Sequence, residues 1–201
     1  ITMEDRLHRR VVGQEEAVQA HMEALWRAEG AAVTRTRIGN VVAHAGGTGP
    51  RLLLIAHGDE LCFLVRSIDE LGYIWLANGQ GWQRGAGLRN GFTIGQHVKI
   101  LARHEVVPGV IAAATGHLAA LTLPEPMELN WNDFWVDTGL SRQELMALGV
   151  TPGTRVIWEA ETVQRGRHVV GKALDDRVLL AVITEGLRRV PGGQRARGPA
   201  P

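Results

Sequence analysis

The sequence predicts an α/β domain that is interrupted by an inserted β-barrel-like domain. Apolar residues at helical spacing occur only toward the two ends of the chain, before residue 30 and after residue 171. The region between about residues 69 and 166 instead contains short β-like segments separated by many glycines. With 201 residues, 45% of them hydrophobic, the chain can bury a core in one large or two small domains.

The first predicted elements are a helix and a β-hairpin. Between residues 13 and 30, apolar side chains recur at positions i, i+4, i+7 and i+8, which places them on one helical face: Val18, Met22, Leu25 and Trp26. Residues 32–38 and 41–43 are typical of two strands joined by a tight turn at Gly39 and Asn40. The chain therefore opens with the mixture of helix and sheet that an α/β domain requires.

An apolar run at residues 52–56 predicts a buried strand that ends at His57. Residues 63–68 predict the next strand. Because open α/β sheets place their chemistry at the C-terminal ends of strands, His57 and Asp59 become candidate site residues. The sequence has one cysteine, Cys62, so an internal disulfide framework is excluded. Because Cys62 lies in apolar sequence, we interpret it as a core residue.

The middle of the chain predicts a small β-barrel or sandwich. Its β-like segments are residues 73–77, 92–101, 106–113 and 155–160. One helix interrupts these segments. Ser141 and Glu144 have the Ser-x-x-Glu spacing of a capping box at its start, and Gly149 is its expected stop.

Helical apolar patterning resumes after Gly171, at residues 174–190. The expected organisation is a first part of the α/β domain at residues 1–68, the inserted domain at 69–166, a second part at 167–190 and a disordered tail at 191–201. The tail is rich in Gly, Pro and Arg and cannot build a core strand. An inserted domain explains how the segments on either side of it could converge without a long structureless loop.

Charge and hydropathy exclude several classes of partner. Lys plus Arg (22) nearly balance Asp plus Glu (21), so no field of one sign attracts nucleic acid or an anionic membrane. The sequence has no run of 18 apolar residues and no basic-then-apolar leader. We therefore expect a cytoplasmic protein with no nucleic-acid and no membrane partner.

Two clusters of histidine and acidic residues flank the inserted domain and suggest half of a two-metal site. They are His57-Gly58-Asp59-Glu60 and Leu174-Asp175-Asp176-Arg177. A neutral imidazole and a carboxylate suit Zn²⁺ or Co²⁺, and Asp59 could accept the other ring N–H of His57. The alternative for Asp175 and Asp176 is that they only cap the helix that follows, and for Asp176 we favour that alternative.

Several blocks of the sequence, in this order, resemble the M42 metallo-aminopeptidases, which include the glutamyl and the tetrahedral aminopeptidases. The similarity runs from about residue 13 to residue 190. The blocks are Gly39-Asn40-Val41-Val42, Ala56-His57-Gly58-Asp59-Glu60, Val107-Pro108-Gly109-Val110-Ile111, Asp133-Phe134-Trp135-Val136-Asp137-Thr138-Gly139, Leu148-Gly149-Val150 and Gly171-Lys172-Ala173-Leu174-Asp175-Asp176-Arg177.

The resemblance implies an exopeptidase with two zinc or cobalt ions, a three-layer α/β catalytic domain and an inserted β-rich domain. Its substrates would be peptides, and such enzymes often form large homo-oligomers. Carried over by position, His57 resembles a ligand to one metal, Asp175 the carboxylate that bridges both, and Asp59 the catalytic acid behind His57. The implied reaction is hydrolysis by a metal-activated water that a glutamate deprotonates.

The sequence also departs from the M42 pattern. Family members carry an adjacent Glu-Glu pair in their second half, which supplies the general base and a ligand, followed by further Asp and His ligands; none of these follows Arg177. Thr36 stands where the family usually has Asp, and Gly58 where Met is common. We therefore expect the chain alone to be inactive. The alternative is a non-catalytic relative that binds peptides or pairs with full-length subunits.

Residues 4–18 resemble the segment that opens an ATPase module in disaggregase-type AAA+ chaperones. Such a module requires a Gly-x-x-x-x-Gly-Lys-Ser/Thr loop, whose backbone amides and lysine hold phosphates. This motif does not occur in the sequence, and the glycine-rich loop at residues 46–50 has no lysine. An ATPase is therefore not expected.

Overall fold

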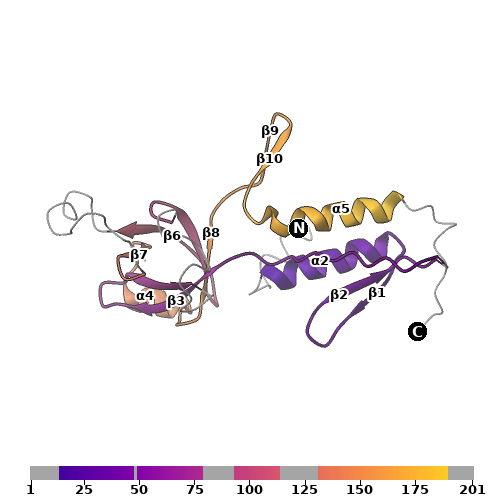
Figure 1. Cartoon of the computed structure of the whole chain (residues 1–201). Coiled ribbons are helices and arrows are strands. Elements are labelled where there is room, and N and C mark those ends of the chain that lie inside the picture. Colours follow the sequence, from indigo (N-terminus) through magenta and orange to yellow (C-terminus); the bar gives the residue numbers. More distant parts are fainter. Residues whose placement is uncertain (1–13, 48, 79–92, 114–130, 190–201) are drawn as a thin grey trace. The chain divides into compact units, whose positions relative to one another are not determined.

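The computed structural model describes residues 14–47, 49–78, 93–113 and 131–189. The chain splits into two compact units, Ile1–Glu60 with Ala173–Pro201 (the α/β unit) and Leu61–Lys172 (the barrel unit) (Figure 1). Residues 61–68 and 167–172, which we had expected in the α/β domain, fall in the barrel unit. Most of the ATPase-like segment and the expected disordered tail lie outside the described residues. No helix in the described part combines the length and apolarity needed to cross a membrane.

The α/β unit contains two helices and one hairpin. Helix α2 (Gln14–Ala28) leads into strands β1 (Ala32–Arg35) and β2 (Val41–His44), which pair antiparallel, and α5 (Leu174–Arg189) returns at the other end of the sequence. The predicted first helix, hairpin and last helix are confirmed. The turn closes because Thr36 N–H donates to the Asn40 carbonyl at 2.8 Å, while Gly39 takes a φ of 96° that favours glycine.

The core of the α/β unit lies between α2 and α5. Its buried side chains include Met22 and Trp26 from α2 and Leu180 and Leu187 from α5. The Trp26 indole N–H donates to the Thr184 hydroxyl at 2.9 Å, and that hydroxyl donates to the Leu180 carbonyl at 2.8 Å. The two polar groups that this interface buries are therefore both satisfied, which removes the cost of burying them.

The prediction of a buried strand at residues 52–56 is wrong. No strand is assigned among the described residues 45–47 and 49–62, and Leu52 and Ile55 are 82% and 76% exposed. The physical reason is the lack of a sheet for this segment to join in the described chain, since β1 and β2 pair only with each other. Only Ala56 at the end of the run packs against the core of the α/β unit. The outward side of α5 is also apolar and exposed at Val178 and Val182.

The barrel unit confirms the predicted inserted barrel. Six strands close in the order β3-β4-β7-β6-β5-β8, and every neighbouring pair is antiparallel. Closure leaves no sheet edge unpaired. The strands are β3 (Phe63–Ile68), β4 (Ile74–Asn78), β5 (His97–Leu101), β6 (Val106–Ala113), β7 (Phe134–Asp137) and β8 (Arg155–Trp158).

Alternating side chains of these strands fill the barrel. Phe63 and Val65 of β3, and Val98 and Ile100 of β5, are almost fully buried, while the residues between them are less so. Register between β3 and β8 aligns Phe63 with Val156. This pairing draws β3 into the barrel unit and explains why the unit begins before the expected boundary.

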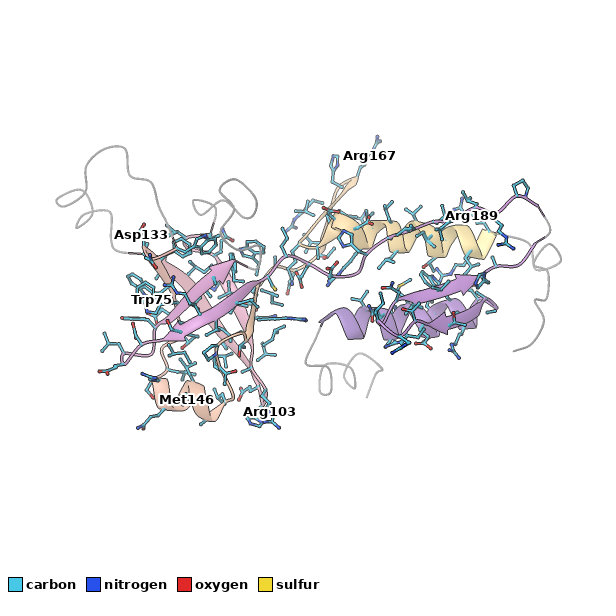
Figure 2. All side chains as sticks on the ribbon, turned by 60° about the horizontal axis from the view of Figure 1, so that its bottom comes forward. Trp75, Arg103, Asp133, Met146, Arg167 and Arg189 are labelled. Carbon is cyan, nitrogen blue, oxygen red and sulfur yellow. The ribbon has the colours of Figure 1, made fainter. Side chains whose placement is uncertain are left out.

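Helix α4 (Arg142–Ala147) has the predicted capping box. Glu144 N–H donates to the Ser141 hydroxyl at 3.3 Å, and Ser141 N–H donates to the Glu144 carboxylate at 2.8 Å. The hydrogen bond from the Ser141 hydroxyl lowers the pKa of Glu144, and the Ser141 N–H adds to this effect. Gly149 follows the helix end with a φ of 85°, as expected of a stop. Met146 projects away from the barrel (Figure 2).

A second hairpin completes the barrel unit. Strands β9 (Val163–Arg165) and β10 (His168–Val170) pair antiparallel, with Arg167 at the tip (Figure 2). The hairpin leads into Gly171, where a Cβ would lie 2.6 Å from the Thr162 hydroxyl oxygen. A larger residue would push the two ends of the hairpin apart.

Candidate metal centre

The two predicted clusters lie together within the α/β unit. The first follows the extended segment at residues 49–56, and the second occupies the start of α5, where Asp175 (φ −85°, ψ 104°) and Asp176 (φ −121°, ψ 20°) are not helical. A direct hydrogen bond joins His57 to Asp176 across 119 positions of sequence. The chain therefore brings an imidazole and two carboxylates to one place.

His57 is held between two carboxylates. Its Nδ1 lies 2.7 Å from Asp59 Oδ1, and its Nε2 lies 3.7 Å from Asp175 Oδ1. Because a carboxylate only accepts, Nδ1 donates to Asp59 when it carries the ring proton, and Nε2 is the nitrogen that faces Asp175. The His57 and Asp175 side chains are 57% and 99% exposed, so solvent reaches both side chains.

Asp176 does more than the capping role that we favoured from the sequence. Its Oδ2 accepts a hydrogen bond from His57 N–H at 3.3 Å, so it contacts the other cluster. Arg177, which the sequence reasoning missed, donates from Nε to the Gly58 carbonyl at 2.9 Å and places Nη2 3.7 Å from Glu60 Oε1. These two partners are a backbone carbonyl and a glutamate far away in the sequence, and no local sequence pattern indicates such contacts.

Gly58 brings this segment close to α2. A Cβ at this position would lie 2.7 Å from Val18 Cγ1 and 3.6 Å from Leu180 Cδ1. The missing side chain therefore lets the backbone between His57 and Asp59 rest on the apolar contact of α2 with α5. This gives a packing reason for a small residue where the M42 pattern often has Met.

Within the described residues, no group of three or more His, Cys, Asp and Glu side chains could hold a metal ion together. His57 Nε2 and Asp175 Oδ1 face each other, while Asp59 is occupied by the Nδ1 of His57. The described residues thus supply two converging donors, which is fewer than the three protein ligands of a typical catalytic zinc.

Sequence comparison decides the family. The family model described as M42 glutamyl aminopeptidase matches residues 39–195, a range that includes both clusters and the whole barrel unit. The chain belongs to the M42 family. FrvX of Escherichia coli strain K12, named as a candidate aminopeptidase, is 34% identical over 161 residues, which are 79% of this chain and 43% of FrvX.

Solved structures show the same fold. The aminopeptidase APDkam598 from the archaeon Desulfurococcus kamchatkensis has a TM-score of 0.76 at 22% identity, over 89% of this chain and 48% of that one. The TET1 peptidase of Pyrococcus horikoshii, which can assemble into a tetrahedron or a large octahedral shell, has a TM-score of 0.71 at 21% identity. That match covers 96% of this chain and 58% of TET1. The M42 chain described here thus spans about half the length of these relatives.

Proposed function

We propose that this chain supplies the first metal ligands and the inserted barrel of an M42 aminopeptidase, which hydrolyses N-terminal residues from peptides. The observation that carries the proposal is the placement of His57 Nε2 opposite Asp175, with Asp59 behind the ring. In the proposed roles, His57 is a ligand through Nε2, Asp175 is the bridging carboxylate and Asp59 orients the imidazole. The α/β unit is then part of a three-layer catalytic domain.

The two facing donors fit part of the coordination shell of a divalent cation such as Zn²⁺ or Co²⁺. Two donors that each lie about 2.1 Å from one tetrahedral cation are roughly 3.4 Å apart. The separation of 3.7 Å between His57 Nε2 and Asp175 Oδ1 is close to this value. When bound, two such cations polarise the peptide carbonyl and lower the pKa of a water. In the proposed role, a hydrogen bond from Nδ1–H to Asp59 orients the ring so that Nε2 faces the cation.

The assembly and location that we propose follow the relatives. The oligomers formed by TET1 support a homo-oligomer for the full-length form of this chain. The single cysteine, Cys62, supports a location in the reducing cytoplasm, and the nearly balanced charge supports peptides rather than nucleic acid as partners.

Metal titration of variants tests the ligand roles. We expect weak binding of Co²⁺ or Zn²⁺ by isothermal calorimetry, and a loss of at least about tenfold in affinity for His57→Ala, since a direct ligand should matter no less than the outer-shell groups whose loss costs about 10–100-fold. Asp175→Ala should weaken binding more than Asp176→Ala. His44→Ala is the matched control, because His44 is an exposed histidine of the same unit at the end of β2. Unchanged affinity in His57→Ala would refute the ligand role.

A further inference from the structure

We propose that Asp176 and Arg177 are positioning residues that hold the His57–Glu60 segment against the start of α5 and so set the separation between His57 and Asp175. This inference rests on the proposed function, because it concerns the placement of the two proposed ligands. Neither residue is assigned a ligand role. Each acts through the backbone or side chain of the opposite cluster.

The segment that carries His57 has no sheet to fix its position. The part of it that the structure describes without a gap, residues 49–62, contains no strand. Besides the approach of His57 to Asp175, its polar contacts to α5 include His57 N–H to Asp176 Oδ2 at 3.3 Å, the Gly58 carbonyl to Arg177 Nε at 2.9 Å, and Glu60 Oε1 to Arg177 Nη2 at 3.7 Å. Three consecutive positions, 175 to 177, therefore provide one proposed ligand and both groups that position the other.

The chemistry of Arg177 suits this role better than that of a lysine. Its planar guanidinium presents Nε–H and Nη2–H along one edge, so it reaches the Gly58 carbonyl and the Glu60 carboxylate together. The Arg177 and Glu60 side chains are 29% and 7% exposed, so this contact is screened less than a surface pair. A lysine ammonium is a single point charge and would satisfy only one of the two partners well.

Asp176 has a different requirement. It needs only an oxygen that accepts the His57 N–H. Asparagine keeps such an oxygen at the same distance along the side chain, whereas alanine removes it. The proposal therefore predicts rescue by Asp176→Asn and no rescue by Arg177→Lys.

The test combines two readouts on the full chain. The first is Co²⁺ affinity by calorimetry. We expect a loss of about 10–100-fold for Asp176→Ala and for Arg177→Met, which is the usual range for groups that orient a ligand. Asp176→Asn should stay within a few-fold of the unsubstituted chain, and Arg177→Lys should resemble Arg177→Met. Arg188→Met is the matched control, because Arg188 is another α5 arginine and pairs with Glu29 at 2.7 Å away from the two clusters.

The second readout needs no metal. Hydrogen exchange at the His57 amide should become faster in Asp176→Ala and remain slow in Asp176→Asn and Arg188→Met, because only the first removes the acceptor. Suppose that neither His57→Ala nor Asp176→Ala changes Co²⁺ binding, while exchange at the His57 amide is still faster in Asp176→Ala. The proposed ligand role of His57 is then refuted, and the hydrogen bond from His57 to Asp176 is supported. The positioning role is overturned if Asp176→Ala and Arg177→Met bind Co²⁺ like the unsubstituted chain, or if Arg188→Met loses as much affinity.

Discussion

The purified 201-residue chain should release no product from aminoacyl chromogenic substrates, even with added Co²⁺ or Zn²⁺. The described residues offer two facing donors, His57 and Asp175, where a catalytic zinc typically has three protein ligands and a water. No Glu-Glu pair follows Arg177 in the sequence to act as general base. Loss of the general base alone should lower the rate of hydrolysis by a factor of about 10²–10⁴. The lack of further metal ligands should remove the remaining catalytic activity.

A chelator and the His57→Ala variant serve as controls that separate turnover by this chain from turnover by a contaminant. Turnover that requires Co²⁺, stops with a chelator and disappears in His57→Ala would contradict the expectation. It would show that residues beyond those described complete the centre. Turnover that survives both treatments would instead indicate a contaminating peptidase, since it would not depend on the proposed ligand.

Limited proteolysis should leave the barrel unit intact while the α/β unit is cut. The barrel closes on itself and buries large side chains such as Phe63 and Phe134 completely. The α/β unit exposes residues 52–55 and, on α5, Val178 and Val182. Because segments with few buried contacts open most readily, we expect cuts there and in residues 191–201, and a resistant fragment near residues 61–172 by mass spectrometry.

A barrel variant provides the control for this experiment. Phe134→Ala should cost about 3–5 kcal/mol of unfolding free energy, as large-to-small changes of buried aromatic residues do, and should make the barrel fragment sensitive to protease. Protection of residues 52–65 and 174–189 together with digestion of residues 97–113 would contradict the account of two separate units.

Features set by local sequence could be predicted. The helical face that carries Met22 and Trp26 became α2, and the Ser141–Glu144 spacing became the cap of α4. Each of these patterns depends only on residues that lie within a few positions of one another in the sequence. The same holds for His57 and Asp59, whose separation of two positions allows the ring contact at 2.7 Å.

Features that depend on distant partners could not be predicted. The apolar run at residues 52–55 has the composition of a buried strand, but burial also requires neighbouring strands, and none is described beside it. Strand β3 joined the barrel because Phe63 pairs with Val156, far along the chain. Asp176 and Arg177 reach backbone groups 119 positions away, so no spacing in the sequence indicated their contacts.

The central claim is that His57 is a metal ligand through Nε2 while Asp59 holds Nδ1–H. Nitrogen-15 NMR of the His57 imidazole tests it most directly, at about pH 8, where an ordinary imidazole is neutral. We predict a protonated Nδ1 and an unprotonated Nε2 in the metal-free chain, and a shift of the Nε2 resonance when Zn²⁺ is added, with the Nδ1 proton retained. A proton on Nε2, or an Nε2 resonance that does not respond to Zn²⁺, would contradict the account.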